Sequence, residues 1–304
     1  MGIAALRKVL NPQPVELSHF AKKTVAVDAD NLLWSFVTAF ATTGEQPVGP
    51  SGEPIGHLLG LAGRLKLYAQ HGIRSAWIYD GEQPKMKEAT LAERAARIEE
   101  DQTIALTDAQ IAESKRVLTA LGIPWIVAPG ESDPQCAALV RSGVAYAAVT
   151  QDYDIALHGA PRAGRNLTGS KTRKPELLDL EVSLAAAGLT RAQLIDAAIL
   201  IGTDYNAGFP GIGPVKAVKL IQKHGELHGA LAAIGATLAE AEDIRALFLA
   251  HPVDAAYQPK WRAPDGGKAA DILEAAGLSR ARGEELARAV APAAPSAQRA
   301  LGDF

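Results

Sequence analysis

Acidic residues follow short apolar segments of this sequence at several places, and together they could bind divalent metal ions. Asp28 ends the first such segment and Asp80 ends the second. The third segment leads into an E-x-D pair, the fourth leads into a D-x-D pair, and one more acid follows Gly202-Thr203. The complete set is Asp28, Asp80, Glu131, Asp133, Asp152, Asp154 and Asp204.

Carboxylates that converge need cations, because two like charges about 4 Å apart repel by roughly 4 kcal/mol at an effective dielectric constant of ~20. Oxygen ligands select hard divalent cations such as Mg²⁺ or Mn²⁺ over zinc. Seven carboxylates exceed what one Mg²⁺ uses, and they suit two ions about 4 Å apart, as in two-metal hydrolysis of phosphodiesters. The alternative, turn residues and helix caps, accounts for any single Asp but not for acids after all four segments.

The apolar segments predict the elements that would position these acids. Near-continuous apolar runs at 24–28, 75–80, 124–128 and 145–150 are typical of buried strands, and 176–180 is a fifth candidate. Helical patterns lie at 31–42, 57–71, 87–100, 107–121 and 132–142, with Thr107 and Ser132 as expected N-caps. This alternation predicts an α/β fold with a central, mainly parallel β-sheet flanked by helices. Because the carboxyl ends of parallel strands share one sheet edge, we expect the acids to meet there.

The second half of the chain is predicted to be almost entirely helical. Helices are expected at 191–201, capped by Thr190, and at 215–224, 238–250, 271–276 and 280–290. We therefore divide the chain into an α/β region at 1–185, a helical region at 186–290 and a flexible tail at 291–304. Ala and Pro dominate 289–297, which predicts an extended or disordered connection.

Composition narrows the class of protein. The chain has 304 residues, of which 48% are hydrophobic and 21% charged, as expected for a folded protein of roughly two domains. Cys136 is its only cysteine, which excludes an intrachain disulfide. No apolar run reaches membrane-spanning length and the first residues lack a signal peptide's apolar core, so we expect an intracellular protein. The net charge of −3 argues against a nucleic-acid binder, because such domains are usually basic.

Two basic features nevertheless point toward a phosphate polymer. In the first, Lys87 and Arg94 are seven residues apart, so in the predicted helix 87–100 they share a face close to Asp80. Basic groups beside a metal site could stabilise charge on a phosphate in the transition state. The alternative for this segment is an ordinary solvated helix.

The second basic feature is a glycine-rich turn, Gly211-Ile212-Gly213-Pro214, that precedes the predicted helix 215–224. Backbone N–H groups in such a turn can approach a phosphate, and the helix dipole favours the anion. Lys216, Lys219 and Lys223 follow the turn. The segment 199–224 is thus typical of a helix-hairpin-helix motif that binds the DNA backbone without regard to sequence. A plain turn between two helices is the alternative.

Taken together, these motifs resemble those of the structure-specific flap endonucleases of the XPG nuclease superfamily, and the archaeal enzymes most closely. The resemblance covers nearly the whole chain. It rests on VAVDADN at 25–31, IYDGEQPKMK at 78–87, APGESDPQCAALV at 128–140 and ILIGTDYNAGFPGIGPVKAVKLIQKHG at 199–225. It implies a PIN-like nuclease core that cuts DNA bearing a 5′ flap, with 5′-3′ exonuclease activity beside it. The implied roles are Okazaki-fragment maturation and long-patch repair.

The resemblance also implies roles for the acids, with two Mg²⁺ ions as cofactors, for which Mn²⁺ could substitute. One ion would be held mainly by Asp80, Glu131, Asp133 and Asp152. The other would be held mainly by Asp152, Asp154 and Asp204, with Asp28 acting through water. Lys87 and Arg94 match the family's basic pair at the scissile phosphate. The implied catalytic set is Lys87, Arg94, Asp80 and Asp152.

Other positions match residues that contact DNA in the family. Trp34 falls where the family places an aromatic ring that stacks on an unpaired nucleotide, although a core position in helix 31–42 would explain it equally well. Gly2 matches a small residue near the active site. The turn at 211–213 would grip duplex DNA, and its carbonyl groups could hold a K⁺ ion.

The end of the chain resembles a partner-binding motif. Gln298, Leu301 and Phe304 fit the Q-x-x-Φ-x-x-aromatic motif that binds the sliding clamp PCNA, with Leu301 and Phe304 as apolar anchors. The usual motif ends in two aromatic residues, whereas Asp303 precedes a single Phe304 here, so we expect weaker clamp binding. A tail without this role is the alternative.

The spacing before the third strand's acids departs from the family, because only 37 positions separate Arg94 from Glu131. Flap endonucleases usually have a longer helical arch there, through which the flap threads. We therefore expect a reduced arch at about 88–106 and weaker selection for threaded flaps. The alternatives are a 5′ exonuclease or junction-cutting nuclease of the same superfamily, and a catalytically silent DNA-binding accessory. We expect a monomer that binds branched DNA and no membrane, in the cytoplasm if the source is archaeal.

Overall fold

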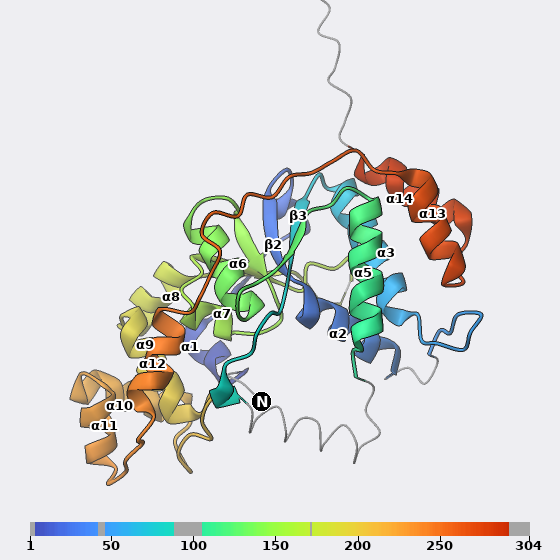
Figure 1. The fold of residues 1–304 in the computed structure, drawn as a ribbon. Coiled ribbons are helices and arrows are strands. Elements are labelled where there is room, and N and C mark those ends of the chain that lie inside the picture. Colours follow the sequence, from blue (N-terminus) through green and yellow to red (C-terminus); the bar gives the residue numbers. More distant parts are fainter. Residues whose placement is uncertain (1–3, 42–45, 88–104, 171, 292–304) are drawn as a thin grey trace, which may run out of the picture.

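The computed structural model describes residues 4–41, 46–87, 105–170 and 172–291, with a seven-stranded sheet at its centre (Figure 1). The strands are β1 (Gln13–Pro14), β2 (Thr24–Asp28), β3 (Arg74–Tyr79), β4 (Trp125–Val127), β5 (Ala147–Val149), β6 (Arg162–Arg165) and β7 (Glu176–Asp179). They lie in the order β1-β7-β6-β5-β2-β3-β4. All pairs from β6 to β4 are parallel, while β7 pairs antiparallel with β6 and with β1. The predicted mainly parallel sheet is confirmed.

All five predicted strands are present with ends within two residues of the expected ones, whereas β1 and β6 were not predicted. The two residues of β1 are exposed, and β6 has the sequence R-A-G-R, so neither shows the apolar run of a buried strand. β1 forms because it pairs with β7, whereas β6 pairs with both β5 and β7, so that Ala163 lies between Ala148 and Leu178. A strand that comes later in the chain therefore contributes to both pairings.

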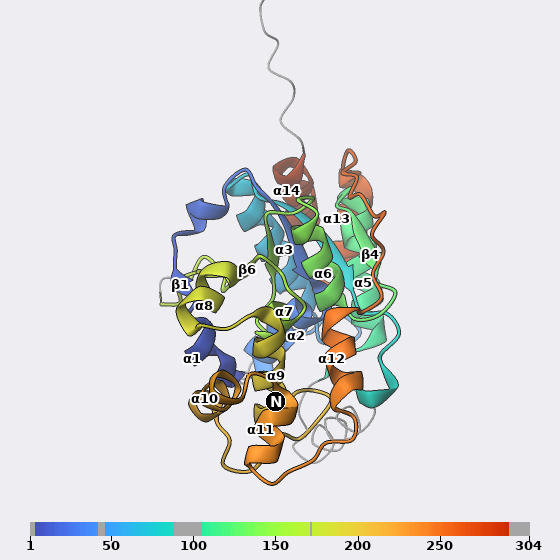
Figure 2. The same cartoon turned by 90° about the vertical axis from the view of Figure 1, so that its left-hand side faces the viewer.

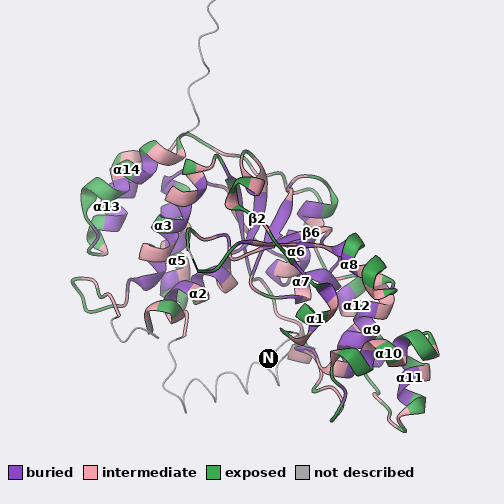
Figure 3. Cartoon of the chain, turned by 180° about the vertical axis from the view of Figure 1, so that it is seen from behind, coloured by how far each residue is buried: buried purple, intermediate pink, exposed green. Residues whose placement is uncertain are grey.

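The sheet buries a hydrophobic core on each face, because successive side chains of a strand point to opposite sides. Val25 and Val27 of β2 contribute to one core, and Ala26 between them contributes to the other. The first core is covered by α2 (Ala29–Ala41), α3 (Gly56–Gln70) and α5 (Asp108–Ala120). The second is covered by α6 (Ser132–Arg141), α7 (Asp154–Leu157) and α9 (Arg191–Ile201). Figure 3 shows the strands between these layers as largely buried.

Capping residues explain where several helices begin. Thr107 and Thr190 each accept the N–H of a glutamine three residues later, and that glutamine bonds back to the cap, so both predicted N-caps are confirmed as capping boxes. The expectation for Ser132 was wrong, because Glu131 occupies the cap position and Ser132 is the first helical residue of α6. Its hydroxyl bonds a buried carboxylate instead, which α6 thereby helps to position.

The helical region forms two separate groups at opposite ends of the molecule (Figure 2). At one end, α9 packs on α10 (Pro214–His224), α11 (Leu227–Ala233) and α12 (Ala241–Leu249), with α8 (Leu180–Ala187) nearby. At the other, α13 (Gly266–Ala275) and α14 (Arg280–Val290) pack on α5 and α3. Helix α13 begins five residues earlier than predicted because Asp265 caps it. The intervening segment 250–265 runs between the two ends (Figure 1).

Several short elements complete the described fold. The chain starts with η1 (Ala4–Leu6), α1 (Arg7–Leu10) and η2 (Leu17–Phe20), and η3 (Lys85–Lys87) follows β3. None of these, nor α7, α8 and α11, was predicted, since each is too short to show a helical period. Within the described ranges, no single helix has the length and apolarity to cross a membrane. Only α8 and α9 taken together have them, and this pair bends by 75°.

Candidate active site

The predicted acids lie at the carboxyl edge of the parallel strands. β2 has β3 on one side and β5 on the other, which makes this edge the topological switch point where ligands bind in open α/β sheets. Asp28 is the last residue of β2, and Asp80 follows β3 directly. Glu131 precedes α6 and Asp154 begins α7, after β4 and β5. The sheet topology thus brings together acids that are far apart in the chain.

Asp28 is buried, and three neighbours hold its carboxylate. Ser132 Oγ donates to Oδ1 at 2.9 Å, and the backbone N–H of Asn31 donates to the same oxygen at 3.3 Å. Thr150 Oγ1 donates to Oδ2 at 3.0 Å. The backbone N–H of Ser132 also donates to Asp80 Oδ1 at 2.7 Å, so the first turn of α6 fixes both carboxylates.

Two further residues of the site, Asn31 and Asp30, were not predicted. Asn31 donates from Nδ2 to Asp152 Oδ2 at 2.7 Å and accepts the N–H of Gln151 at 3.0 Å, so it connects the ends of β2 and β5. Asp30 accepts the backbone N–H of Asp80 at 2.8 Å. The only signal in the sequence that could have indicated these two residues is that they follow Asp28 within three positions.

A lysine ammonium group lies between two of the acids. Lys87, at the end of η3, forms a short ion pair with Glu131 and lies 3.4 Å from Asp204 Oδ2. Burial lowers the pKa of Lys87, but these carboxylates outweigh it and the pKa is raised, so the side chain is a cation. The Tyr205 hydroxyl donates a short hydrogen bond to the second oxygen of Glu131. Both oxygens of Glu131 are therefore engaged.

Ionisation of several other acids is unfavourable in the metal-free fold, because these side chains are buried and lie close together. Burial and the neighbouring carboxylates raise the pKa of Asp28 and of Asp133 well above the usual range. The same causes raise the pKa of Asp154 to about 8, and that of Asp30 to about 6. Asp133 Oδ1 is buried without a hydrogen-bond partner. Crowded carboxylates with an unpartnered oxygen fit a site that receives hard cations.

The acids are close but do not already form a metal cage. Within the described ranges, no three Asp, Glu, His or Cys side chains are arranged so that they could hold a metal ion. Lys87 instead serves as the counter-ion of Glu131 and Asp204. Divalent ions bound at these carboxylates would replace the ammonium group in that role.

We expect divalent metal to raise the melting temperature more at pH 8 than at pH 6. A raised pKa means that Asp154 is protonated in the metal-free fold, and the stability this gives is present at low pH and lost as the pH rises toward about 8. Metal binds the ionised carboxylates, so its binding releases these protons and strengthens with pH. Thermal unfolding with Mn²⁺ or with EDTA at each pH measures the effect. Equal metal-induced shifts at the two pH values would contradict it.

The glycine-rich turn lies between α9 and α10, as the helix-hairpin-helix motif requires. Gly211 has a φ of +75°, a conformation that favours glycine, and Gly213 is the N-cap of α10. Lys216, Lys219 and Lys223 are exposed on α10, and Lys216 Nζ lies 3.5 Å from the carbonyl oxygen of Gly211. The turn and the three lysines therefore present a basic surface.

Trp34 lies on α2, the helix that follows Asp28 directly. Its side chain is 49% exposed, so packing in the core does not explain it. An exposed ring on this helix is available for stacking against a base.

Some predicted site residues lie outside the described part of the chain. These are Gly2, Arg94, Gln298, Leu301 and Phe304, together with the expected arch at 88–106 except its last two residues.

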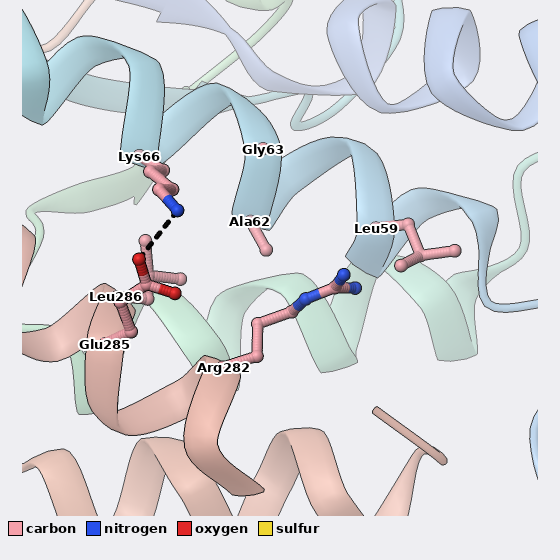
Figure 4. A pocket seen from close by; sticks show the side chains of 7 residues that line it. All are labelled: Leu59, Ala62, Gly63, Lys66, Arg282, Glu285 and Leu286. Atoms are coloured by element: carbon pink, nitrogen blue, oxygen red, sulfur yellow. Dashed lines mark hydrogen bonds and ion pairs between the residues drawn. The ribbon is translucent and has the colours of Figure 1, made fainter. Parts of the chain in front are cut away.

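A surface pocket between α3 and α14 is separate from the acidic edge (Figure 4). Leu59 and Lys66 of α3 face Arg282 and Glu285 of α14 across it. Lys66 and Glu285 form an ion pair at 2.7 Å, so the one acid in its lining is already neutralised. This pocket lacks the convergent carboxylates of the sheet edge.

Two family models match the chain in the regions that carry the site. The XPG N-terminal domain matches residues 1–101, which include Asp28, Asp80 and Lys87. The XPG I-region matches residues 122–204, which extend from before Glu131 to Asp204.

The chain is also similar to curated flap endonucleases over most of its length. It is 36% identical over 302 residues to flap endonuclease 1 of Methanopyrus kandleri, covering 87% of each chain. It is 36% identical over 306 residues to flap endonuclease 1 of Archaeoglobus fulgidus, covering 90% of this chain and 91% of the relative.

Solved structures share the fold. The structure of flap endonuclease-1 from Methanococcus jannaschii matches with a TM-score of 0.80 at 27% identity, covering 94% of this chain and 97% of that one. The catalytic core of Rad2 in complex with DNA substrate matches with a TM-score of 0.78 at 23% identity, covering 95% and 100%.

Proposed function

Because this chain belongs to the XPG family of nucleases and is a structure-specific flap endonuclease, we propose that the acidic edge of its sheet is where the DNA phosphodiester is hydrolysed. One observation carries the proposal. Acids that follow β2, β3, β4 and β5 converge with Asp204 at this edge, and the ammonium of Lys87 pairs with two of them. The enzyme is a divalent-metal-dependent phosphodiester hydrolase that binds branched DNA.

We propose that the site holds two Mg²⁺ ions, for which Mn²⁺ can substitute. When bound, the ions supply the Lewis acidity that activates water and offsets charge on the leaving oxygen. One ion is assigned mainly to Asp80, Glu131, Asp133 and Asp152. The other is assigned mainly to Asp152, Asp154 and Asp204, with Asp28 acting through water.

The protein's own groups would orient this site and respond to its charge. Ser132 and Thr150 hold Asp28, so the carboxylate at the end of β2 stays in place. Once its carboxylate partners have another counter-ion, Lys87 can turn toward the scissile phosphate, where the family's second basic residue corresponds to Arg94. Trp34 would stack on the unpaired nucleotide.

The substrate that we propose is DNA with a 5′ single-stranded flap, cut to leave a 5′-phosphate and a 3′-hydroxyl, with 5′-3′ exonuclease activity on related ends. The relatives from M. kandleri and A. fulgidus support an archaeal type of flap endonuclease. We further propose that it acts as a monomer in the cytoplasm. Its roles would be Okazaki-fragment maturation and long-patch repair.

Cleavage of labelled 5′-flap, nicked and four-way-junction DNA with Mg²⁺, Mn²⁺ or EDTA tests this function. We expect the flap to be cut fastest, no cutting in EDTA, and product ends that carry a 5′-phosphate and a 3′-hydroxyl. Faster cutting of the junction would instead support a junction-cutting nuclease. Absence of cutting under all conditions would support a silent DNA-binding accessory.

We propose that the surface formed by the turn at 211–213 and the lysines of α10 grips duplex DNA, and that the carbonyls of the turn hold K⁺. Lys216→Ala should weaken duplex binding and reduce the slope of log affinity against log salt by about 1, because one phosphate contact is lost. Binding titrations at several salt concentrations measure both quantities. Lys22→Ala is the matched control, since Lys22 is exposed just before β2 begins, at the opposite end of that strand from Asp28. An unchanged slope for Lys216→Ala would refute the assignment.

We propose that the tail motif binds the sliding clamp PCNA. Phe304→Ala should weaken clamp binding by at least about tenfold, because a buried aromatic anchor dominates such small interfaces. Surface plasmon resonance on immobilised clamp measures the affinity, and Arg299→Ala, at an unspecified position of the motif between Gln298 and Leu301, is the control. Equal affinity of the Phe304→Ala variant and the unchanged protein would show that the tail has another role.

A further inference from the structure

A histidine from the C-terminal half of the chain contacts the loop that carries Glu131. His251 lies just after α12, and its Nε2 accepts the backbone N–H of Glu131 at 3.2 Å, although 120 positions separate the two residues. An accepting Nε2 requires the neutral ring with its proton on Nδ1.

The ring of His251 also explains why its neighbour in that loop is glycine. A Cβ atom added at Gly130 would lie 2.4 Å from His251 Nε2, well inside van der Waals contact. No positive φ is involved at Gly130, so the conflict is with the histidine and not with the backbone conformation. Gly130 and His251 therefore form a matched pair.

Aromatic contacts connect the same helix end to the side chain of Glu131. The ring of His251 lies 5.8 Å from that of His158, which lies 5.2 Å from Phe248 of α12. Phe248 in turn lies 5.3 Å from Tyr205, whose hydroxyl donates to Glu131. Residues at the end of α12 thus contact Glu131 in two ways. His251 contacts its backbone N–H directly, and Phe248 reaches its carboxylate through Tyr205.

We propose that His251 is a positioning residue that fixes the Glu131 backbone for divalent-metal binding, and that Gly130 is small in order to admit it. The inference rests on the proposed metal site at the acidic edge. A hydrogen bond to a ligand's own backbone limits where its carboxylate can go, and loss of such outer contacts commonly weakens metal affinity about 10- to 100-fold. Because α12 packs on α9, the helix before the turn at 211–213, the helix-hairpin-helix and the metal site would then be connected through α12.

The first test compares His251→Leu with His251→Gln, whose side-chain oxygen can still accept the Glu131 N–H. Mn²⁺ binding to the full, DNA-free chain is measured by electron paramagnetic resonance, with kcat and KM on a flap measured in parallel. We expect His251→Leu to weaken Mn²⁺ affinity about tenfold or more, with a change in kcat larger than that in KM, and His251→Gln to recover most of the affinity. Wild-type Mn²⁺ affinity in His251→Leu, or equal losses in both variants, would overturn the proposal.

Two further variants separate this role from general destabilisation. His57→Leu removes another buried histidine, which bonds Glu113 at 3.0 Å, and should lower the melting temperature without changing Mn²⁺ affinity. A loss of Mn²⁺ affinity in His57→Leu as large as that in His251→Leu would count against positioning.

Asp154→Ala should lose Mn²⁺ affinity whether or not His251 matters. Normal Mn²⁺ affinity in Asp154→Ala would contradict the proposed metal site itself. If Asp154→Ala loses Mn²⁺ affinity while His251→Leu keeps it, only the inference about His251 is overturned.

A double-mutant cycle tests the matched pair directly. Gly130→Ala alone should weaken Mn²⁺ affinity, because the new methyl group displaces the His251 ring. In a His251→Ala background the same change should cost little, since the space is then free and the hydrogen bond is already lost. Additive losses from the two substitutions would overturn the pairing.

Discussion

Asp154→Ala is expected to reduce metal-dependent cleavage of a 5′ flap about 10²–10³-fold while flap binding is retained. Asp154 begins α7, and its burial, together with the charges of Asp152, Asp204 and Glu131, raises its pKa to about 8. Removing it takes a ligand from a metal that must stabilise transition-state charge, and loss of a single such stabilising group costs about 10²–10³-fold in other enzymes. Single-turnover cleavage and flap binding in Ca²⁺ measure the two quantities separately.

The fold itself should tolerate the loss of Asp154. The carboxylate lies among like charges, so the variant should be at least as stable as the unchanged protein in EDTA at pH 8. Asp243→Ala, an exposed acid of α12, is the control and should cleave normally. Near-normal cleavage by Asp154→Ala in Mg²⁺ would remove the two-metal proposal.

Lys87→Met is expected to reduce kcat about 10²–10³-fold and yet to increase the stabilisation that metal gives the DNA-free protein. The ammonium pairs with Glu131 and Asp204 when no metal is bound, so its removal takes one positive charge away from two buried carboxylates. The variant should therefore melt lower in EDTA, and Mn²⁺ should restore more of its melting temperature than it adds to the unchanged protein. Methionine keeps most of the side-chain volume, which limits loss of packing.

Lys85→Met provides the matched control for this second prediction. Lys85 belongs to the same short helix but is exposed, and no ion pair to the acids is found for it among the described residues. It should leave kcat and the metal-induced shift unchanged. A normal kcat in Lys87→Met would show that this lysine serves only as a counter-ion in the metal-free protein.

The net charge of −3 argued against a nucleic-acid binder, and that interpretation was wrong. A sum over the chain hides how the charge is arranged. The acids gather at one sheet edge, whereas Lys216, Lys219 and Lys223 lie exposed on α10. Segregated charge lets an acidic protein hold a polyanion at one place and metal ions at another.

The strands could be predicted because their signal is local. A strand covered on both faces must be apolar throughout, as in Thr24–Asp28, and an acid directly after such a run is visible without any knowledge of distant contacts. Strand β6 could not be predicted, because its pairing with β7 compensates for a weak apolar pattern. The same reasoning explains Ser132, which resembles an N-cap locally, although its hydroxyl donates to Asp28 at the distant end of β2.

By itself, then, the sequence determined the α/β order, the acids at the strand ends and the edge at which they meet, because parallel strands place their carboxyl ends together whatever the side chains do. Three features depended on the tertiary structure. They are the placement of Lys87 between Glu131 and Asp204, the inclusion of Asp30 and Asn31, and the bond from His251 to the Glu131 backbone. Each is a contact between side chains or loops that are distant in sequence, and only the packing of helices around the sheet brings their atoms within hydrogen-bonding range.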